Sequence, residues 1–216
     1  MNDIDKNSRA YKIASGNGGM NLPNKLTISR VVMIPVFILF FYLNFTGHYF
    51  VALGIFCIAS LTDLLDGKIA RKYNLVTNLG KFLDPIADKV LVLSALVVML
   101  TAPRIFVGGL GDWALIAAGC GVAIILAREI IVSGFRMVAA GNGTVIAADI
   151  FGKYKTVTQD VAVIILLVGA GIAEFTDHIA GSIINYIGIV FFAVSAILTI
   201  ISGTNYLVKN REVLKK

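Results

Sequence analysis

The sequence has few charged residues, few histidines and only two cysteines. Of its 216 residues 15% are charged and 57% are hydrophobic, whereas an ordinary soluble domain has about 25% charged residues. Cys57 and Cys120 lie in separate apolar runs without a CxxC or Cys/His grouping, which excludes a disulfide-stapled module and disfavours zinc. The apolar excess is too large for the core of a 23.1 kDa globule. This composition excludes a disordered chain and a typical cytosolic enzyme, and it is typical of a polytopic membrane protein.

The long apolar runs predict the fold. A spanning helix needs about 20 mostly apolar residues, and the mean hydropathy of the chain is +0.85. We therefore expect an all-α protein with six transmembrane helices in a single domain over residues 20–216. The expected spans are 26–44, 49–65, 84–102, 113–134, 156–174 and 182–207. Residues 1–19 are polar and aperiodic, and we expect them to be a leader outside this domain, either appended or disordered.

Basic residues are almost absent from one set of connectors. Of the 19 lysines and arginines only Arg104 falls in the connectors 46–48, 103–112 and 174–181. The others lie in or beside the N-terminal segment, the two long polar connectors expected at 66–83 and 135–155, and the C-terminal tail. Because basic residues mark cytoplasmic loops, both termini are expected to face the cytoplasm. The net charge of +6 predicts that the protein attracts anionic lipid headgroups or phosphate. We expect no nucleic acid partner.

Acidic residues are also few, yet four of the 13 gather in one stretch: Asp63, Asp66, Asp84 and Asp88. The first two are spaced i, i+3 and share a helix face, and the last two are spaced i, i+4. We expect Asp84 to cap a helix whose first turn contains Pro85. If the two helices pack as an antiparallel hairpin, both acidic faces converge. Carboxylates this close repel one another unless cations intervene, and their hard oxygens suit Mg²⁺, Mn²⁺ or Ca²⁺. A pair of such ions can clamp phosphoryl oxygens during in-line displacement.

Four further residues between these acids fit a phosphate-bearing ligand. Gly67 and Gly80 leave the backbone open to close approach, Ala70 keeps that face small, and Arg71 supplies a cation. Taken singly, the acids are also compatible with a helix cap or with solvated helix ends, and the glycines with helix packing. The whole constellation favours a functional site, because acids within a membrane are costly unless they are used.

The pattern D-x2-D-G-x2-A-R-x8-G-x3-D-x3-D, from Asp63 to Asp88, resembles the signature of the CDP-alcohol phosphotransferases at every specified position. Further segments resemble the bacterial phosphatidylglycerophosphate synthases of that family. They are NLPNKLTISR at 21–30, REIIVSGFR at 128–136 and GKYKT at 152–156. The resemblance therefore extends over essentially the whole chain after the leader.

The resemblance implies an enzyme that transfers the phosphatidyl group of CDP-diacylglycerol to sn-glycerol-3-phosphate and releases CMP. It implies that two divalent cations, Mg²⁺ or Mn²⁺, are held by Asp63, Asp66 and Asp84. Asp88 would be the last ligand and the base that accepts the proton of the acceptor's 1-hydroxyl. The residues implied to line the CDP pocket are Gly67, Ala70, Arg71 and Gly80. A homodimer in the bacterial cytoplasmic (inner) membrane is implied by the resemblance alone.

The acceptor carries a phosphate dianion, which calls for a separate cationic cradle. The residues predicted to form it are Arg128, Arg136, Lys153 and Lys155. Arg128 is favoured because an unpaired cation beside an apolar span is costly; alternatively it pairs with Glu129 or Asp149. The two lysines are alternatively plain anchors at the membrane surface. Arg30 either lines the site or anchors the first span.

Other functions remain open at this point. The same chemistry could serve inositol phosphate, serine, choline or phosphatidylglycerol as acceptor, although a basic cradle disfavours an uncharged or zwitterionic one. A cation-coupled transporter or channel would also place acids in helices. It would carry them near the midplane and show inverted repeats, and the two halves of this sequence lack matching patterns.

Overall fold

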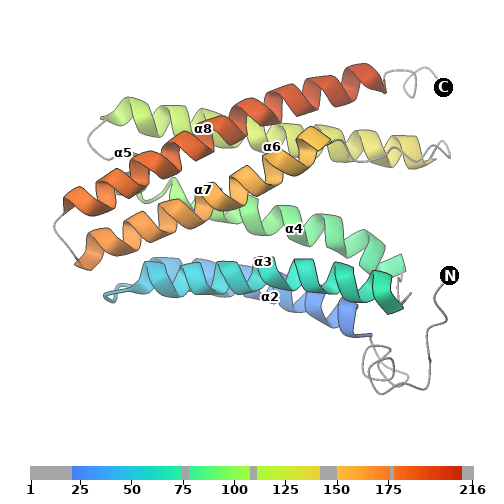
Figure 1. Cartoon of the computed structure of the whole chain (residues 1–216), viewed down its shortest axis with the longest axis horizontal. Coiled ribbons are helices and arrows are strands. Elements are labelled where there is room, and N and C mark those ends of the chain that lie inside the picture. Colours follow the sequence, from blue (N-terminus) through green and yellow to red (C-terminus); the bar gives the residue numbers. More distant parts are fainter. Residues whose placement is uncertain (1–20, 74–77, 108–110, 142–149, 176–177, 211–216) are drawn as a thin grey trace. The chain divides into compact units, whose positions relative to one another are not determined.

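The computed structural model describes residues 21–73, 78–107, 111–141, 150–175 and 178–210 (Figure 1). Within these ranges every regular element is a helix. In chain order they are α2 (Leu22–Tyr42), α3 (His48–Tyr73), α4 (Asn78–Met99), α5 (Pro103–Val107), α6 (Asp112–Gly141), α7 (Ile150–Phe175) and α8 (His178–Lys209). The chain divides into two compact units, Met1–Ser94 and Ala95–Lys216. The expected leader at 1–19 lies outside the described residues.

The start of α2 follows directly from its sequence. Asn21 is the N-cap, and its side-chain Oδ1 accepts a hydrogen bond from the backbone N–H of Asn24 at 3.2 Å. The proline that follows, Pro23, sits in the first turn, where its missing N–H costs nothing. A capping asparagine beside a proline therefore fixes where the first helix begins.

Helices α2 and α3 form an antiparallel pair in the first unit and lie side by side (Figure 1). Gly47, with a φ of 92°, allows the tight reversal between them. Aromatic rings interlock along the pair: the ring centroids of Phe37 and Phe56 are 6.2 Å apart, and those of Phe41 and Tyr49 are 5.2 Å apart. In lipid, such close packing is a main source of helix association, because the lipid tails are as apolar as the side chains.

The buried face of α2 changes from apolar to polar along its length. The buried residues from Thr27 to Phe41 recur at intervals of three and four: Thr27, Arg30, Ile34, Phe37 and Phe41. On α3 the buried series continues in the same way from Ala52 through Phe56 and Ala59 to Asp66. One continuous seam therefore carries aromatic rings near the turn and charged groups at the other end.

In the second unit α7 and α8 approach each other closely through small residues. A Cβ atom added to Gly169 would lie 2.1 Å from Oδ1 of Asn185, and one added to Gly181 would lie 2.6 Å from Cβ of Ala173. Only glycine fits at these two positions, as is typical of close helix crossings in membranes. The short helix α5 packs against α6, α7 and α8.

Within the described residues, four segments are long and apolar enough to cross a membrane: Asn24–Tyr42, Asp112–Ala139, Ile150–Phe175 and Ile179–Lys209. Helices α3 and α4 contain shorter apolar segments, His48–Asp63 and Lys89–Met99. The prediction of an all-helical membrane protein is confirmed, whereas the count of six spans is not. The reason is that the acidic motif lies within α3 and α4 and shortens their apolar parts.

Two local predictions are wrong. Asp84 is not a helix cap, because α4 already begins at Asn78 and places both Asp84 and Pro85 inside the helix. Arg136 does not lie in a connector, because α6 continues to Gly141. In both cases the helix extends beyond the boundary that was expected from the sequence. Pro85 lies beyond the first turn of α4, so it removes one backbone hydrogen bond of this helix, and the helix nevertheless continues past it.

Candidate functional site

Arg30 of α2 binds both of the motif acids on α3. Its Nη1 lies 2.6 Å from Oδ1 of Asp63, and its Nη2 lies 2.6 Å from Oδ2 of Asp66. The Nη2 contact is also a hydrogen bond, whereas the Nη1 contact lacks hydrogen-bond geometry and is an ion pair only. Thr27 Oγ1, one turn away, donates to the same Asp66 oxygen at 3.4 Å. The predicted sharing of one helix face by the two acids is confirmed, since one guanidinium reaches both.

This arrangement is deeply buried on one side and open on the other. The Arg30 side chain is fully buried, and the Asp66 side chain is 4% exposed. The Asp63 side chain is 35% exposed. A buried guanidinium is tolerated only when it is paired, so Arg30 and Asp66 require each other, while Asp63 retains access to a ligand.

The donor set suits a hard divalent cation. Asp63 and Asp66 supply carboxylate oxygens, which Mg²⁺ and Mn²⁺ prefer. The ion pairs to Arg30 engage one oxygen of each carboxylate. Among the described side chains no three acidic, histidine or cysteine groups come together. The two described acids therefore fit part of a metal site, to which further ligands must be added.

The other motif residues lie on the same helices, but their side chains lie outside the described part. Gly67, Ala70 and Arg71 are in α3, and Gly80 is in α4. Asp84 and Asp88 are also in α4, one helical turn apart. The convergence of these two acids with Asp63 and Asp66 remains a prediction.

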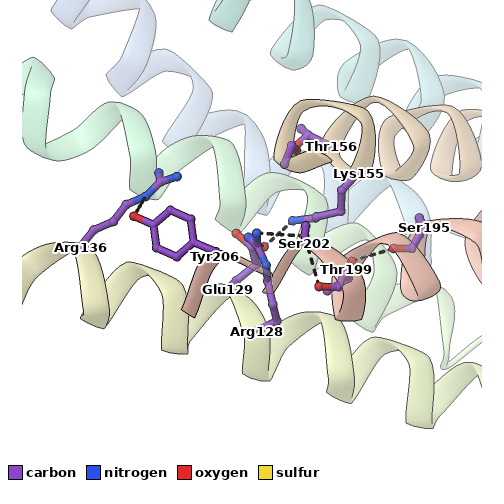
Figure 2. Close-up of polar contacts among 10 residues, drawn as sticks. Arg128, Glu129, Arg136, Lys155, Thr156, Ser195, Thr199, Ser202 and Tyr206 are labelled. Atoms are coloured by element: carbon purple, nitrogen blue, oxygen red, sulfur yellow. Dashed lines mark hydrogen bonds and ion pairs between the residues drawn. The ribbon is translucent and has the colours of Figure 1, made fainter. Parts of the chain in front are cut away.

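A second polar cluster lies between α6, α7 and α8 (Figure 2). Its centre is Glu129, which is 6% exposed. Oε1 of Glu129 accepts from Nη1 of Arg128 at 2.9 Å and also from Nζ of Lys155. The Lys155 residue is 4% exposed, so the alternative of a plain surface anchor does not apply to it. Two cations of neighbouring helices therefore contact one buried carboxylate oxygen.

Arg128 extends across α8. Its Nη2 donates to Oγ of Ser202 at 3.1 Å. The Arg128 side chain also passes over Gly203, and a Cβ atom added to Gly203 would lie 2.9 Å from Cγ of Arg128. Nε of Arg128 is buried without a hydrogen-bond partner among the described residues. The alternative of a pair with Glu129 is confirmed, yet this pair leaves one donor of the guanidinium unused.

The two remaining cradle residues lie apart from Glu129. Arg136 donates from Nε to the Tyr206 hydroxyl at 3.2 Å, and its guanidinium carbon lies 5.3 Å from the centroid of that ring (Figure 2). Tyr206 in turn packs edge-on against Phe135, with the centroids 6.0 Å apart. Lys153 is exposed on α7. The structure thus brings Arg128 and Lys155 together, and it places Arg136 and Lys153 elsewhere on the same helices.

Three contributors to this second cluster were not among the predicted site residues: Glu129, Ser202 and Tyr206. Glu129 was considered only as a partner for Arg128, although a lone acid in an apolar helix is itself a signal. Ser202 and Tyr206 could have been found from the spacing of polar residues on α8. Ser195, Thr199, Ser202 and Tyr206 recur every three or four residues on α8, and all are buried.

Comparison with known proteins gives consistent matches over most of the chain. The family model of the CDP-alcohol phosphatidyltransferases matches residues 20–201. A Bacillus subtilis (strain 168) protein named CDP-diacylglycerol--glycerol-3-phosphate 3-phosphatidyltransferase is 37% identical over 90% of this chain and 97% of its own length. Proteins of the same name from Shigella flexneri serotype 5b and Escherichia coli (strain K12) are each 40% identical, over 87% of this chain and 93% of theirs.

Proposed function

Because the chain belongs to the CDP-alcohol phosphatidyltransferase family, we propose that it transfers the phosphatidyl group of CDP-diacylglycerol to sn-glycerol-3-phosphate. The products are phosphatidylglycerophosphate and CMP, and the reaction is a step of phospholipid biosynthesis. The relatives named for this reaction match nearly their full length. The observation that carries the proposal is the complete acidic motif, whose first two acids lie on one face of α3 and contact Arg30.

The acids of the motif carry the chemistry in this proposal. Asp63, Asp66, Asp84 and Asp88 hold two divalent cations, Mg²⁺ or Mn²⁺, which when bound neutralise the diphosphate and stabilise the leaving CMP. Asp88 also accepts the proton of the acceptor's 1-hydroxyl as its oxygen attacks the phosphatidyl phosphorus. The bond from that phosphorus to the CMP oxygen breaks in the same displacement. Gly67, Ala70, Arg71 and Gly80 line the pocket for the CDP group.

The acceptor phosphate is bound by cations of α6 and α7. Arg128 and Lys155 are the central pair, because both contact Oε1 of Glu129 and so lie close together. Arg136 and Lys153 add positive charge farther along α6 and α7. A dianionic acceptor is favoured over serine or choline because basic side chains gathered on α6 and α7 attract an anion.

The proposal extends to location and assembly. The protein resides in the bacterial cytoplasmic membrane, with both termini and the active site on the cytoplasmic side. The support is the charge bias of the sequence, in which Arg104 alone falls among the opposite connectors. Acyl chains can then stay in the bilayer while the headgroup reacts at the surface. A homodimer follows from the family resemblance.

The experiment is CMP release by the purified protein in liposomes containing CDP-diacylglycerol and Mg²⁺. Glycerol-3-phosphate, inositol phosphate, serine and no acceptor are compared, each with and without EDTA. We expect release only with glycerol-3-phosphate, abolished by EDTA and restored by added Mg²⁺ or Mn²⁺.

Two other outcomes are informative. Release with inositol phosphate alone would retain the reaction class and overturn the assignment of the acceptor. Absence of release with every acceptor, in protein that circular dichroism shows to be folded, would overturn the proposed function and favour a transporter.

A further inference from the structure

We propose that Arg30 is the built-in counter-ion of the acidic motif, a positioning residue that holds Asp63 and Asp66 together when no divalent cation is bound. The inference rests on the proposed metal-binding role of these acids, and it assigns a role to a residue outside the motif itself. In the absence of metal, two carboxylates one turn apart on α3 repel each other. Arg30 provides the charge that offsets this repulsion.

The geometry supports a bridging role. Nη1 and Nη2 of one planar guanidinium lie 2.6 Å from oxygens of two different acids. A forked, permanently charged group can do this, whereas the single ammonium of a lysine offers one compact charge. The spacing of the two acids matches the fork, because residues three apart on a helix are neighbours on its surface.

Burial makes the bridge obligatory in the metal-free protein. The Arg30 side chain is fully buried and the Asp66 side chain is 4% exposed, so neither charge can rely on water. Thr27, one turn before Arg30, adds a hydrogen bond to Asp66. Removal of one partner leaves the other buried with one compensating charge fewer. The charged end of the α2 and α3 seam therefore depends on this contact.

The bridge also leaves room for a cation. Each ion pair uses one oxygen of its carboxylate, and the Asp63 side chain is 35% exposed. Arg30 can thus fix the orientation of both acids without covering Asp63. A divalent cation that then binds takes over part of the charge compensation, so the protein should depend less on Arg30 when metal is present.

The test is a double-mutant cycle on thermal unfolding in EDTA, with wild type, Arg30→Met, Asp66→Asn and the double variant. Arg30→Met keeps the length of the chain and removes the charge. We expect it to lower the Tm by roughly 6–12 °C. In the double variant at least half of this Tm loss should be restored, because residue 66 then carries no charge that needs Arg30. Lys25→Met removes an exposed cation of the same helix and should change the Tm by about 1 °C at most.

A packing role would give a different result. If Arg30 acts only by filling space, the losses of the two single variants add in the double variant, and the inference is overturned. If Arg30→Met cannot be purified, Arg30→Lys enters the same cycle with a smaller expected loss and the same criterion.

Metal supplies a second criterion that keeps this inference separate from the proposed function. In a preparation whose wild type releases CMP, saturating Mg²⁺ should at least halve the Tm loss of Arg30→Met. An undiminished loss there would overturn the counter-ion role while leaving the function intact. If the wild type releases no CMP, the cycle in EDTA still decides the role of Arg30, since it requires no metal.

Discussion

Arg128 lies directly over Gly203, with its Cγ 2.9 Å from the place that a Cβ atom of residue 203 would occupy. The contact joins α6 to α8, and the hydrogen bond from Arg128 to Ser202 lies beside it. The Arg128 side chain can therefore follow this path because residue 203 is a glycine. Because Arg128 also pairs with Glu129, a displacement at Gly203 reaches the centre of the second polar cluster.

Gly203→Ala should weaken binding of the acceptor. The added methyl group forces Arg128 aside at a cost of about 1 kcal/mol, which corresponds to a rise in KM for glycerol-3-phosphate of roughly fivefold. The KM for CDP-diacylglycerol should change little. Steady-state kinetics with each substrate varied in turn measures both values.

Gly119→Ala is the matched control for this prediction. A Cβ atom on Gly119, in α6, has no neighbour within 4 Å, and alanine is the better helix former. Both KM values should stay at the wild-type level. An equal effect of the two substitutions, or an effect of Gly203→Ala on CDP-diacylglycerol alone, would contradict the assigned path of Arg128.

Lys155→Met and Lys153→Met should differ in stability although both remove one positive charge from α7. Lys155 is buried against Glu129, and its loss leaves a buried carboxylate with one cation fewer, at a cost of about 3 kcal/mol. Lys153 is exposed, so its substitution should change stability by at most about 0.5 kcal/mol. Thermal unfolding of the two variants in the same detergent measures the difference. Equal shifts would show that the ion pair with Glu129 does not stabilise the fold.

Labelling of single cysteines tests the proposed orientation. Lys25 and Thr46 are exposed and lie near opposite ends of the Asn24–Tyr42 span. With Cys57 and Cys120 replaced by alanine, Thr46→Cys should react with an impermeant maleimide added outside spheroplasts. Lys25→Cys should react only after the membrane is opened. The reverse pattern would contradict a cytoplasmic N-terminus.

Helix faces could be predicted from the sequence wherever spacing alone decides them. Asp63 and Asp66 were expected on one face, and Arg30 contacts both. Arg30 itself was left between two roles, because its pairing depends on the register of α2 against α3. That register is set by the packing of rings such as Phe37 and Phe56, which periodicity on a single helix does not specify.

Helix ends were predicted less well. Pro85 indicated a helix start, yet α4 begins at Asn78, because surrounding structure can override the local preference of a proline. The extension of α6 to Gly141 likewise places Arg136 where it reaches Tyr206. The pairing of Lys155 with Glu129 joins a side chain of α7 to one of α6, and no pattern within either segment indicates that these side chains meet.

The most direct measurement of the central claim is the transfer of label from radioactive glycerol-3-phosphate into the chloroform-soluble fraction. Wild type, Asp88→Asn and Asp112→Asn are compared with CDP-diacylglycerol and Mg²⁺; Asp112 is an exposed acid in the first turn of α6. The account predicts label in lipid for wild type and Asp112→Asn, and a rate at least about 100-fold lower for Asp88→Asn. Label entering lipid at the wild-type rate in Asp88→Asn, or no lipid label in folded wild type, would contradict it.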